Sequence, residues 1–179
     1  MIWFWSDHHY FHRGIIRLAR RPFSSIAEMH ETFRRNNNKV VSNEDIVVYI
    51  GDVSAISTDR MRSVMDEYVG DRMLLRGNHD RGPFAMRKAG FPVVLHEAVF
   101  KLRGKTILVR HRPLDFLPDG IDGIFHGHVH RTEPTGTYGA GETLYIPPFN
   151  VNLCVEMTNY APVTYLAALR TLRSQLSGK

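Results

Sequence analysis

Residues 46–52 read Ile-Val-Val-Tyr-Ile-Gly-Asp, a run of five apolar, mostly β-branched residues that stops at a glycine and a carboxylate. Such a run is typical of a buried strand. Four other segments repeat the design, because each is largely apolar and is followed within a few residues by a polar side chain. They are residues 2–5 before Asp7, 72–76 before Asn78, 106–109 before His111 and 121–125 before His128.

Helical patterns lie between these strands. Ser25 is a suitable N-cap for a helix over residues 26–40, with Glu28 at the capping-box distance. The spacing of apolar residues predicts further helices over residues 61–69 and 165–176, the last ended by Gly178. Strands that alternate with helices predict an α/β fold, in one domain over residues 1–179, with its ligand at the carboxyl ends of the strands.

Composition narrows the class of protein. The lone cysteine, Cys154, cannot form an internal disulfide, which excludes a disulfide-stapled secreted module. No apolar run approaches the ~18 residues that a membrane helix needs, so we expect a cytoplasmic protein with no membrane partner. The 23 Lys and Arg against 18 Asp and Glu give a net charge of +5, which favours phosphate-bearing partners. Ten histidines are also present, and imidazole is the commonest metal ligand.

The strand ends carry side chains that can bind a metal ion or carry a proton. Asp7-x-His9 and His128-x-His130 each place two such side chains on one side of an extended backbone, because side chains alternate along a strand. One such pair alone is usually a helix cap or a satisfied polar contact. Five elements in order, each after a predicted strand, predict joint metal binding. The full set is Asp7, His9, Asp52, Asn78, His79, Asp80, His111, His128 and His130.

The order D-x-H, GD, GNHD, H and GHxH across residues 7–130 resembles the calcineurin-like metallophosphoesterase superfamily, in particular its small single-domain bacterial and phage members. Residues 152–156 and 160–163 resemble the closing strand and turn of those members. The resemblance implies a four-layer αββα sandwich, with two mixed β-sheets flanked by helices and a dinuclear metal site at the C-terminal ends of the strands. It also implies a division of ligands, with Asp7, His9 and His130 on one ion, Asn78, His111 and His128 on the other, and Asp52 bridging both.

The donor chemistry agrees with two divalent transition-metal ions. Four imidazoles, two carboxylates and one amide form a mixed nitrogen and oxygen set, which favours manganese, with iron or zinc next and nickel or cobalt also compatible. The two oxygens of Asp52 can span ions ~3.5–4 Å apart, and a hydroxide bridging such ions would attack phosphorus directly. His79 would then protonate the leaving group. Asp80 would orient His79, or alternatively cap a helix beginning near Pro83.

These residues predict a metal-dependent phosphoesterase, a hydrolase acting on a phosphomonoester or phosphodiester such as a nucleotide or a cyclic nucleotide. His12 and Arg13 are predicted substrate contacts, because they lie close to the first motif and a guanidinium grips phosphate with two hydrogen bonds. We expect the site to be open or to be covered only by the loops at residues 112–120 and 131–143, which are candidates for setting substrate choice.

The remaining histidines are expected to have no part in the chemistry. His8 and His126 neighbour predicted ligands but should point the other way by alternation. His30 should lie on a helix surface, and His96 in a strand.

Other functions remain as alternatives. A nuclease acting on DNA or RNA is favoured by the positive charge, whereas a non-catalytic basic nucleic-acid-binding protein with a structural metal site would have no use for a proton donor at His79. Residues 51–57 do not meet the GDxVDRG pattern of protein serine/threonine phosphatases. The motifs of metallo-β-lactamase-like hydrolases, of HExxH proteases and of P-loop proteins are each broken at a required residue.

Overall fold

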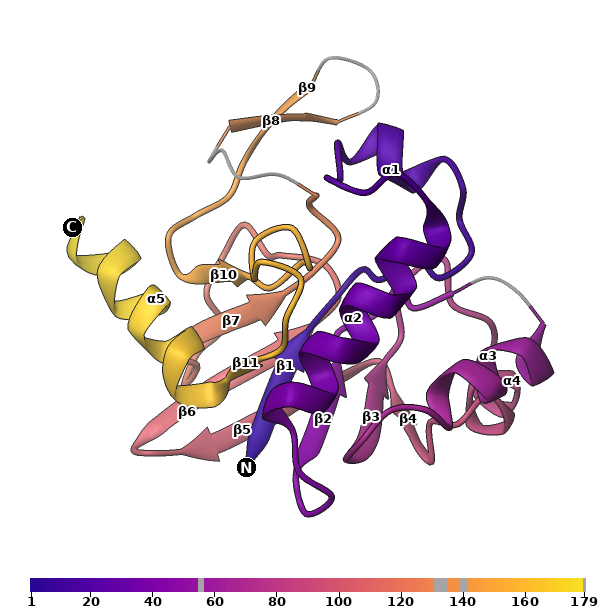
Figure 1. Cartoon of the computed structure of the whole chain (residues 1–179). Helices are drawn as coiled ribbons and strands as arrows, with labels where there is room; N and C mark the ends of the chain where they lie inside the picture. Colours follow the sequence, from indigo (N-terminus) through magenta and orange to yellow (C-terminus); the bar gives the residue numbers. More distant parts are fainter. Residues whose placement is uncertain (55–56, 131–134, 139–141, 179) are drawn as a thin grey trace.

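The structure is a computed structural model that describes residues 1–54, 57–130, 135–138 and 142–178. Two β-sheets form its body (Figure 1). In the first sheet the order is β11-β1-β2-β3-β4, with β1 to β4 parallel and β11 antiparallel to β1. These strands are β1 (Ile2–Trp5), β2 (Ile46–Tyr49), β3 (Asp71–Leu75), β4 (Val93–Leu95) and β11 (Val163–Thr164).

The second sheet has the order β10-β7-β6-β5 and is also mixed, because β5 and β6 are antiparallel and the other pairs are parallel. β5 and β6 form a hairpin whose turn residues Arg103 and Gly104 both have positive φ, at 54° and 69°. A separate two-stranded hairpin, β8 and β9, projects from the body in Figure 1. The strands are β5 (Glu97–Leu102), β6 (Lys105–Arg110), β7 (Gly123–His126), β8 (Thr135–Tyr138), β9 (Glu142–Tyr145) and β10 (Asn150–Asn152).

Helices cover the sheets because each carries an apolar stripe. α2 begins after Ser25, whose hydroxyl accepts a hydrogen bond from the Glu28 N–H at 3.1 Å, as its sequence predicts. α2, α3 and α4 pack on the first sheet, and α5 packs its inward-facing side chains into the apolar core between the two sheets. The helices are α1 (Ile15–Leu18), α2 (Ile26–Val40), α3 (Thr58–Met65), α4 (Pro83–Lys88) and α5 (Tyr165–Ser177).

The predicted fold class is confirmed: two mixed sheets are flanked by helices, and alternate residues of β1 serve the two cores. Trp5 faces the helices, while Phe4 faces the second sheet. One helix is shorter than predicted, because α3 ends at Met65 rather than near residue 69. The guanidinium of Arg72 donates to the backbone carbonyls of Met65 and Tyr68 and so provides hydrogen-bond partners for carbonyl groups at and just beyond the end of the helix. Among the described residues, no helix is long and apolar enough to span a membrane.

Candidate metal centre

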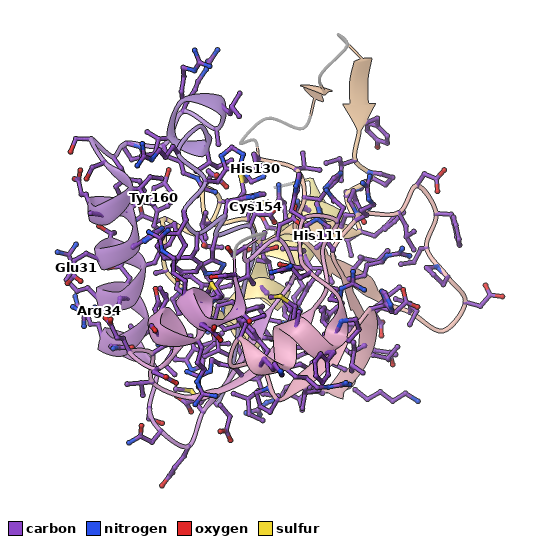
Figure 2. All side chains as sticks on the ribbon, turned by 90° about the vertical axis from the view of Figure 1, so that its right-hand side faces the viewer. Glu31, Arg34, His111, His130, Cys154 and Tyr160 are labelled. Carbon is purple, nitrogen blue, oxygen red and sulfur yellow. The ribbon has the colours of Figure 1, made fainter. Side chains whose placement is uncertain are left out.

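Residues that follow the strands converge in two groups at one end of the molecule. Asp7, His9 and His130 form the first group, and Asp52, His111 and His128 form the second, with the donor atoms of each group within 4.8 Å of one another. Figure 2 labels His130, Cys154 and His111 close together in this region, one residue from each of three segments far apart in the sequence. The resemblance assigns Asp7, His9 and His130 to one ion and His111 and His128 to the other, and the same residues lie together in the two groups; which ion each one binds stays a prediction.

The first group contains a buried oxygen without a protein partner. Asp7 Oδ2 accepts hydrogen bonds from Ser6 Oγ, from the His128 N–H at 2.8 Å and from Cys154 Sγ at 3.2 Å. Asp7 Oδ1 has no hydrogen-bond partner among the described residues, and it lies 3.4 Å from His130 Nε2. Leaving a buried polar atom unpaired costs about 1–3 kcal/mol. A divalent cation between this oxygen and the neighbouring imidazoles would satisfy it, so the donor set fits a metal ion.

The second group shares an oxygen with the first. Asp52 Oδ2 lies 3.3 Å from His111 Nε2 and 3.7 Å from His9 Nε2, which belongs to the first group. Asn78 Oδ1 lies 3.2 Å from His111 Nε2, which adds the amide to this group. We expected the two oxygens of Asp52 to divide between two ions. In the structure Oδ1 accepts a hydrogen bond from the His79 N–H at 2.8 Å, and Oδ2 is the oxygen that lies close to both His111 and His9, so the division between two ions stays a prediction.

Backbone geometry, rather than strand alternation, aims these side chains. Asp7, His9, Asp52 and His128 have φ values of 61°, 51°, 52° and 70°, all in the left-handed region. The extended backbone predicted for Asp7-x-His9 is therefore wrong, although both side chains still reach one group. Such conformations cost on the order of 1–3 kcal/mol each and cluster at functional sites. Hydrogen bonds from the Asp7 N–H to Gly51 O and from the His9 N–H to Asp52 O, both 3.0 Å, hold the two loops together.

Glycine is required where these loops touch. A Cβ on Gly77 would lie 2.1 Å from Asp52 Oδ1, and a Cβ on Gly127 would lie 2.0 Å from Ser6 Oγ and 2.2 Å from Asp7 Oδ2. No real Cβ approaches that closely. Gly77 thus lets the loop of the GNH motif approach the Asp52 carboxylate, and Gly127 lets the loop of the GHxH motif approach the Asp7 carboxylate.

Burial and charge set the ionisation of both groups. Burial alone would raise the pKa of Asp7, but the ring of His9, 3.8 Å from Oδ1, and the charges of His130 and His111 outweigh it and hold that pKa well below its usual range. Burial would likewise lower the pKa of His111, yet its contact with Asp52 and the carboxylate charges raise it to about 9. Burial, assisted by the charge of His111, lowers the pKa of His128 to about 4. The carboxylates are therefore anionic at neutral pH and attract cations.

The predicted proton donor lies at the edge of the two groups. The side chain of His79 is 56% exposed, and its Nε2 lies 3.9 Å from Asp52 Oδ2. Its ring centroid is 5.3 Å from that of His9. An imidazole that is open to solvent and adjacent to both groups can exchange a proton with a molecule bound there.

Asp80 has partners that we did not predict. Its carboxylate accepts hydrogen bonds from the backbone N–H groups of Asp52, Gly77, Val53 and Ser54. The alternative role as a helix cap is wrong, because Gly82 is the N-cap of α4 and that cap has no side-chain hydrogen bond. Asp80 thus holds the loop that carries Asp52 through backbone hydrogen bonds. Its proposed role in orienting the His79 ring stays a prediction.

The predicted substrate contacts lie on the surface beside the first group. His12 is exposed, with its ring centroid 5.9 Å from that of His9. Arg13 is also exposed, and its contact with substrate stays a prediction. A further arginine reaches the second group, since Arg112 Nη2 donates to Asn78 Oδ1 at 3.4 Å. Of the two predicted covering loops, residues 112–120 are described, whereas residues 131–134 and 139–141 lie outside the described part of the chain.

Two of the other histidines are buried and turned away from the groups, as predicted. His8 packs among the rings of Trp5 and Tyr49, and His126 Nδ1 lies 2.7 Å from Gly127 O. His96 is exposed in the bend between β4 and β5 rather than within a strand. His30 does more than lie on a helix surface.

His30 connects α2 to the loop that carries the first motif. Its Nε2 accepts a hydrogen bond from the Phe11 N–H at 3.0 Å. Burial, with a smaller contribution from the charge of Arg60, lowers the pKa of His30 to about 4, so the ring is neutral at pH 7. Hydrogen bonding of this kind requires the neutral ring, because a protonated imidazole has no lone pair to offer.

Sequence reasoning missed Arg21, Cys154 and Glu156. Arg21 and Cys154 are buried next to the first group, and the side chain of Glu156, only 7% exposed, places Oε1 3.1 Å from His130 Nδ1. Glu156 lies within the predicted closing strand and turn, but nothing local in the sequence indicates that it meets Arg21, 135 positions away. The available signal was Glu156 itself, because a carboxylate in a predicted closing strand is buried and a buried carboxylate needs a cationic partner.

Comparisons with known proteins support the fold and identify a relative of the chain, but they do not identify its function. The chain matches no family model. A structure of a protein of unknown function from Aquifex aeolicus, AQ665, aligns with a TM-score of 0.72 at 21% identity, covering 95% of this chain and 98% of that one, and shares its fold. A novel archaeal phosphodiesterase aligns with a TM-score of only 0.43 at 14% identity over 82% of each chain, which is too low to bear on function. The uncharacterized protein MJ1445 of Methanocaldococcus jannaschii is 32% identical over 164 residues, 89% of this chain and 84% of that protein. The chain belongs to the family of MJ1445.

Proposed function

We propose that the protein is a metal-dependent phosphoesterase with two metal ions in one site. One observation carries the proposal: two groups of imidazoles and carboxylates converge on a single oxygen, Asp52 Oδ2. A structural metal site would close its coordination shell and keep no titratable ring at its rim. The exposed imidazole of His79 is such a ring. The motif order across residues 7–130, which resembles the calcineurin-like metallophosphoesterases, supports the same function.

The residues divide into two ligand sets with one shared member. Asp7, His9 and His130 would hold one ion, and Asn78, His111 and His128 the other, with Asp52 between them. When bound, a pair of divalent ions polarises a phosphoryl oxygen and lowers the pKa of water to near neutrality. Manganese is the first candidate, because carboxylate and amide oxygens join the imidazoles in the donor set, and iron, zinc, nickel and cobalt are the other candidates.

Groups around the two ligand sets would position the substrate and move a proton. His79 would deliver a proton from its ring to the leaving oxygen. The backbone N–H of His79 donates to Asp52 Oδ1, which fixes the position of the His79 backbone beside the two ligand sets. Arg112, His12 and Arg13 line the exposed rim, where they would bind the non-reacting phosphate oxygens. The chain thereby supplies charge neutralisation and a general acid, and needs no covalent nucleophile of its own.

The substrate proposed is a small phosphodiester or phosphomonoester, with nucleotides and cyclic nucleotides included. A nuclease acting on DNA or RNA is the second candidate, favoured by the net charge of +5. The two candidates differ in salt dependence, because long nucleic acids release many counterions on binding and small esters do not.

The test is a panel of nitrophenyl phosphate, bis-nitrophenyl phosphate, cyclic nucleotides and oligonucleotides, each assayed with Mn, Fe, Co, Ni, Zn and Mg. Metal content is measured by elemental analysis on the same samples. We expect about two ions per active chain, and we expect Asp52→Asn to lose both ions, because its Oδ2 faces both groups. Glu44→Gln, at an exposed carboxylate in the turn before β2, is the matched control. Full activity with one ion per chain, or after complete chelation, would contradict the proposal.

A further inference from the structure

The guanidinium of Arg21 is buried beneath the first group and joins two parts of it. Arg21 Nη2 donates to Asp7 O at 2.6 Å, and Nη1 donates to His8 O at 2.8 Å. On its other side, Arg21 Nε donates to Glu156 Oε1 at 2.8 Å. The side chain of Arg21 is fully buried and that of Glu156 is 7% exposed. One cation thus ties the loop after β1 to the segment after β10.

Glu156 passes this contact on to His130. The oxygen that accepts from Arg21, Oε1, also lies 3.1 Å from His130 Nδ1. An ionised carboxylate can only accept hydrogen bonds, so Nδ1 must carry the hydrogen. The lone pair of the neutral ring is then on Nε2, which lies 3.4 Å from Asp7 Oδ1 and 3.2 Å from His9 Nε2. Glu156 therefore selects the tautomer that can bind a metal at the first group.

The second group has a different arrangement. His111 Nδ1 lies 2.8 Å from Ile50 O, a backbone carbonyl, and not from a carboxylate. A carboxylate behind a ligating histidine raises the basicity of the ring more than a neutral carbonyl does, and losing such a partner typically costs 10–100-fold in metal affinity. His130 and His111 therefore differ in the group behind the ring, which is a carboxylate for His130 and a carbonyl for His111.

We propose that Arg21 and Glu156 are positioning residues that hold His130 in the tautomer with its Nε2 lone pair toward Asp7, and thereby make the first group the tighter of two metal sites. The inference rests on the proposed two-ion site, and it assigns a function to two residues outside the predicted ligand set.

A rival role for Glu156 comes from the same cluster. His130, Cys154 and Glu156 also offer donor atoms within 4.8 Å of one another. A cation among them would stand beside the buried guanidinium of Arg21, and the thiol of Cys154 already donates to Asp7 Oδ2. Electrostatic repulsion and the loss of both contacts disfavour a third ion there.

The test is Glu156→Gln in the full chain. With the Gln amide oxygen in the place of Oε1, both the contact with Arg21 and the contact with His130 Nδ1 would be kept, but the acceptor would be neutral. His130 would keep its hydrogen on Nδ1, while its Nε2 lone pair would become less basic and bind a metal less tightly. Glu97→Gln is the control, because Glu97 forms an exposed ion pair with Arg110 at 3.7 Å, away from both groups.

Two readouts are measured. Nitrogen-15 NMR of the imidazole side chains, with the His130 signals assigned through His130→Asn, reports the tautomer in the metal-free chain. Titration with Mn and Zn by calorimetry and elemental analysis reports the affinity of each site. We expect Nδ1–H in the wild type and in both variants, with a 10–100-fold loss of affinity at one site of Glu156→Gln and none at the other.

Each outcome decides the inference. A wild-type His130 with its hydrogen on Nε2 overturns it even if Glu156→Gln fails to fold, and so does a folded Glu156→Gln with two sites of unchanged affinity. A third ion that disappears in Cys154→Ser would make Glu156 a ligand and also overturn it. If the wild type binds no second ion, the proposed two-ion function is wrong. The NMR measurement then still decides independently whether Glu156 sets the tautomer of His130.

Discussion

Asp80 provides a direct test of how the site is built. Its carboxylate receives the N–H groups of Asp52 at 2.9 Å and Gly77 at 2.8 Å on Oδ2, and those of Val53 at 2.8 Å and Ser54 at 3.3 Å on Oδ1. The substitution Asp80→Asn keeps the size of the side chain but replaces one oxygen by an NH₂ group. Whichever way the amide turns, two backbone N–H groups then face a donor.

The size of the effect follows from that count. The amide oxygen will keep the two short bonds to Asp52 and Gly77, because both are 2.9 Å or less. The N–H groups of Val53 and Ser54 lose the carboxylate, and each buried donor without its acceptor costs about 1–3 kcal/mol. We therefore expect Asp80→Asn to lower the free energy of unfolding by about 2–5 kcal/mol. For a chain of this size that corresponds to a fall in melting temperature of about 5–15 °C.

Urea denaturation of the chelator-treated full chain measures this loss, with exposed Asp119→Asn as the matched control. The same samples are loaded with Mn and analysed for metal, since displacement of Asp52 should weaken both ligand sets. A loss of stability below about 0.5 kcal/mol would refute the reasoning. Lost activity with unchanged stability and metal content would return Asp80 to the role of orienting His79.

Three further predictions concern the same region. Gly127→Ala should deplete metal, because its Cβ would collide with Asp7 Oδ2, while Gly82→Ala, with nothing within 4 Å, should not; equal metal content in the two variants would count against the close approach. His30, whose pKa of about 4 is below its unfolded value of ~6.5, makes the folded chain lose stability as the pH falls between those values. After a discount for partial exposure, unfolding free energies should show that His30→Gln loses about 1–2 kcal/mol less than the wild type between pH 7 and 4.5; parallel curves would exclude this role. His79→Asn should keep its metal and lose ~100-fold in rate on alkyl esters but less on nitrophenyl esters; equal deficits with depleted metal would make it a structural residue.

The strands and the membership of the site were predictable because both depend on local sequence. An apolar run such as residues 46–50 can be stable only if it is buried, and a polar residue directly after it marks the strand end. Parallel strands bring their ends to one edge, so Asp7, Asp52 and Asn78 had to come near each other once the sheet formed. The edge strands β4, β10 and β11 were missed, because two or three residues carry too little pattern to recognise, and β5, β8 and β9 were also not among the five predicted strands.

The geometry of the site was not predictable, because it depends on contacts between distant segments. Alternation along a strand placed His8 and His9 on opposite sides, yet the actual cause is a pair of left-handed turns. The role of Asp80 depends on four N–H groups from two loops, which no spacing rule reveals. Likewise, Glu156 is within reach of His130 only because the segment after β10 folds back beside β7.

The left-handed turns show how the chain forms the site before any ligand binds. Asp7, His9 and Asp52 each adopt a conformation that costs free energy, and that cost must be offset by contacts made within the protein. The contacts are visible: the loops after β1 and β2 exchange backbone hydrogen bonds, Asp80 fixes the second loop, and Arg21 fixes the first. Because these are all protein–protein bonds, the donor atoms are held near one another independently of a cation. An ion entering such a site would need little reorganisation of its ligands, because the neighbouring histidines already keep the buried Asp7 carboxylate anionic.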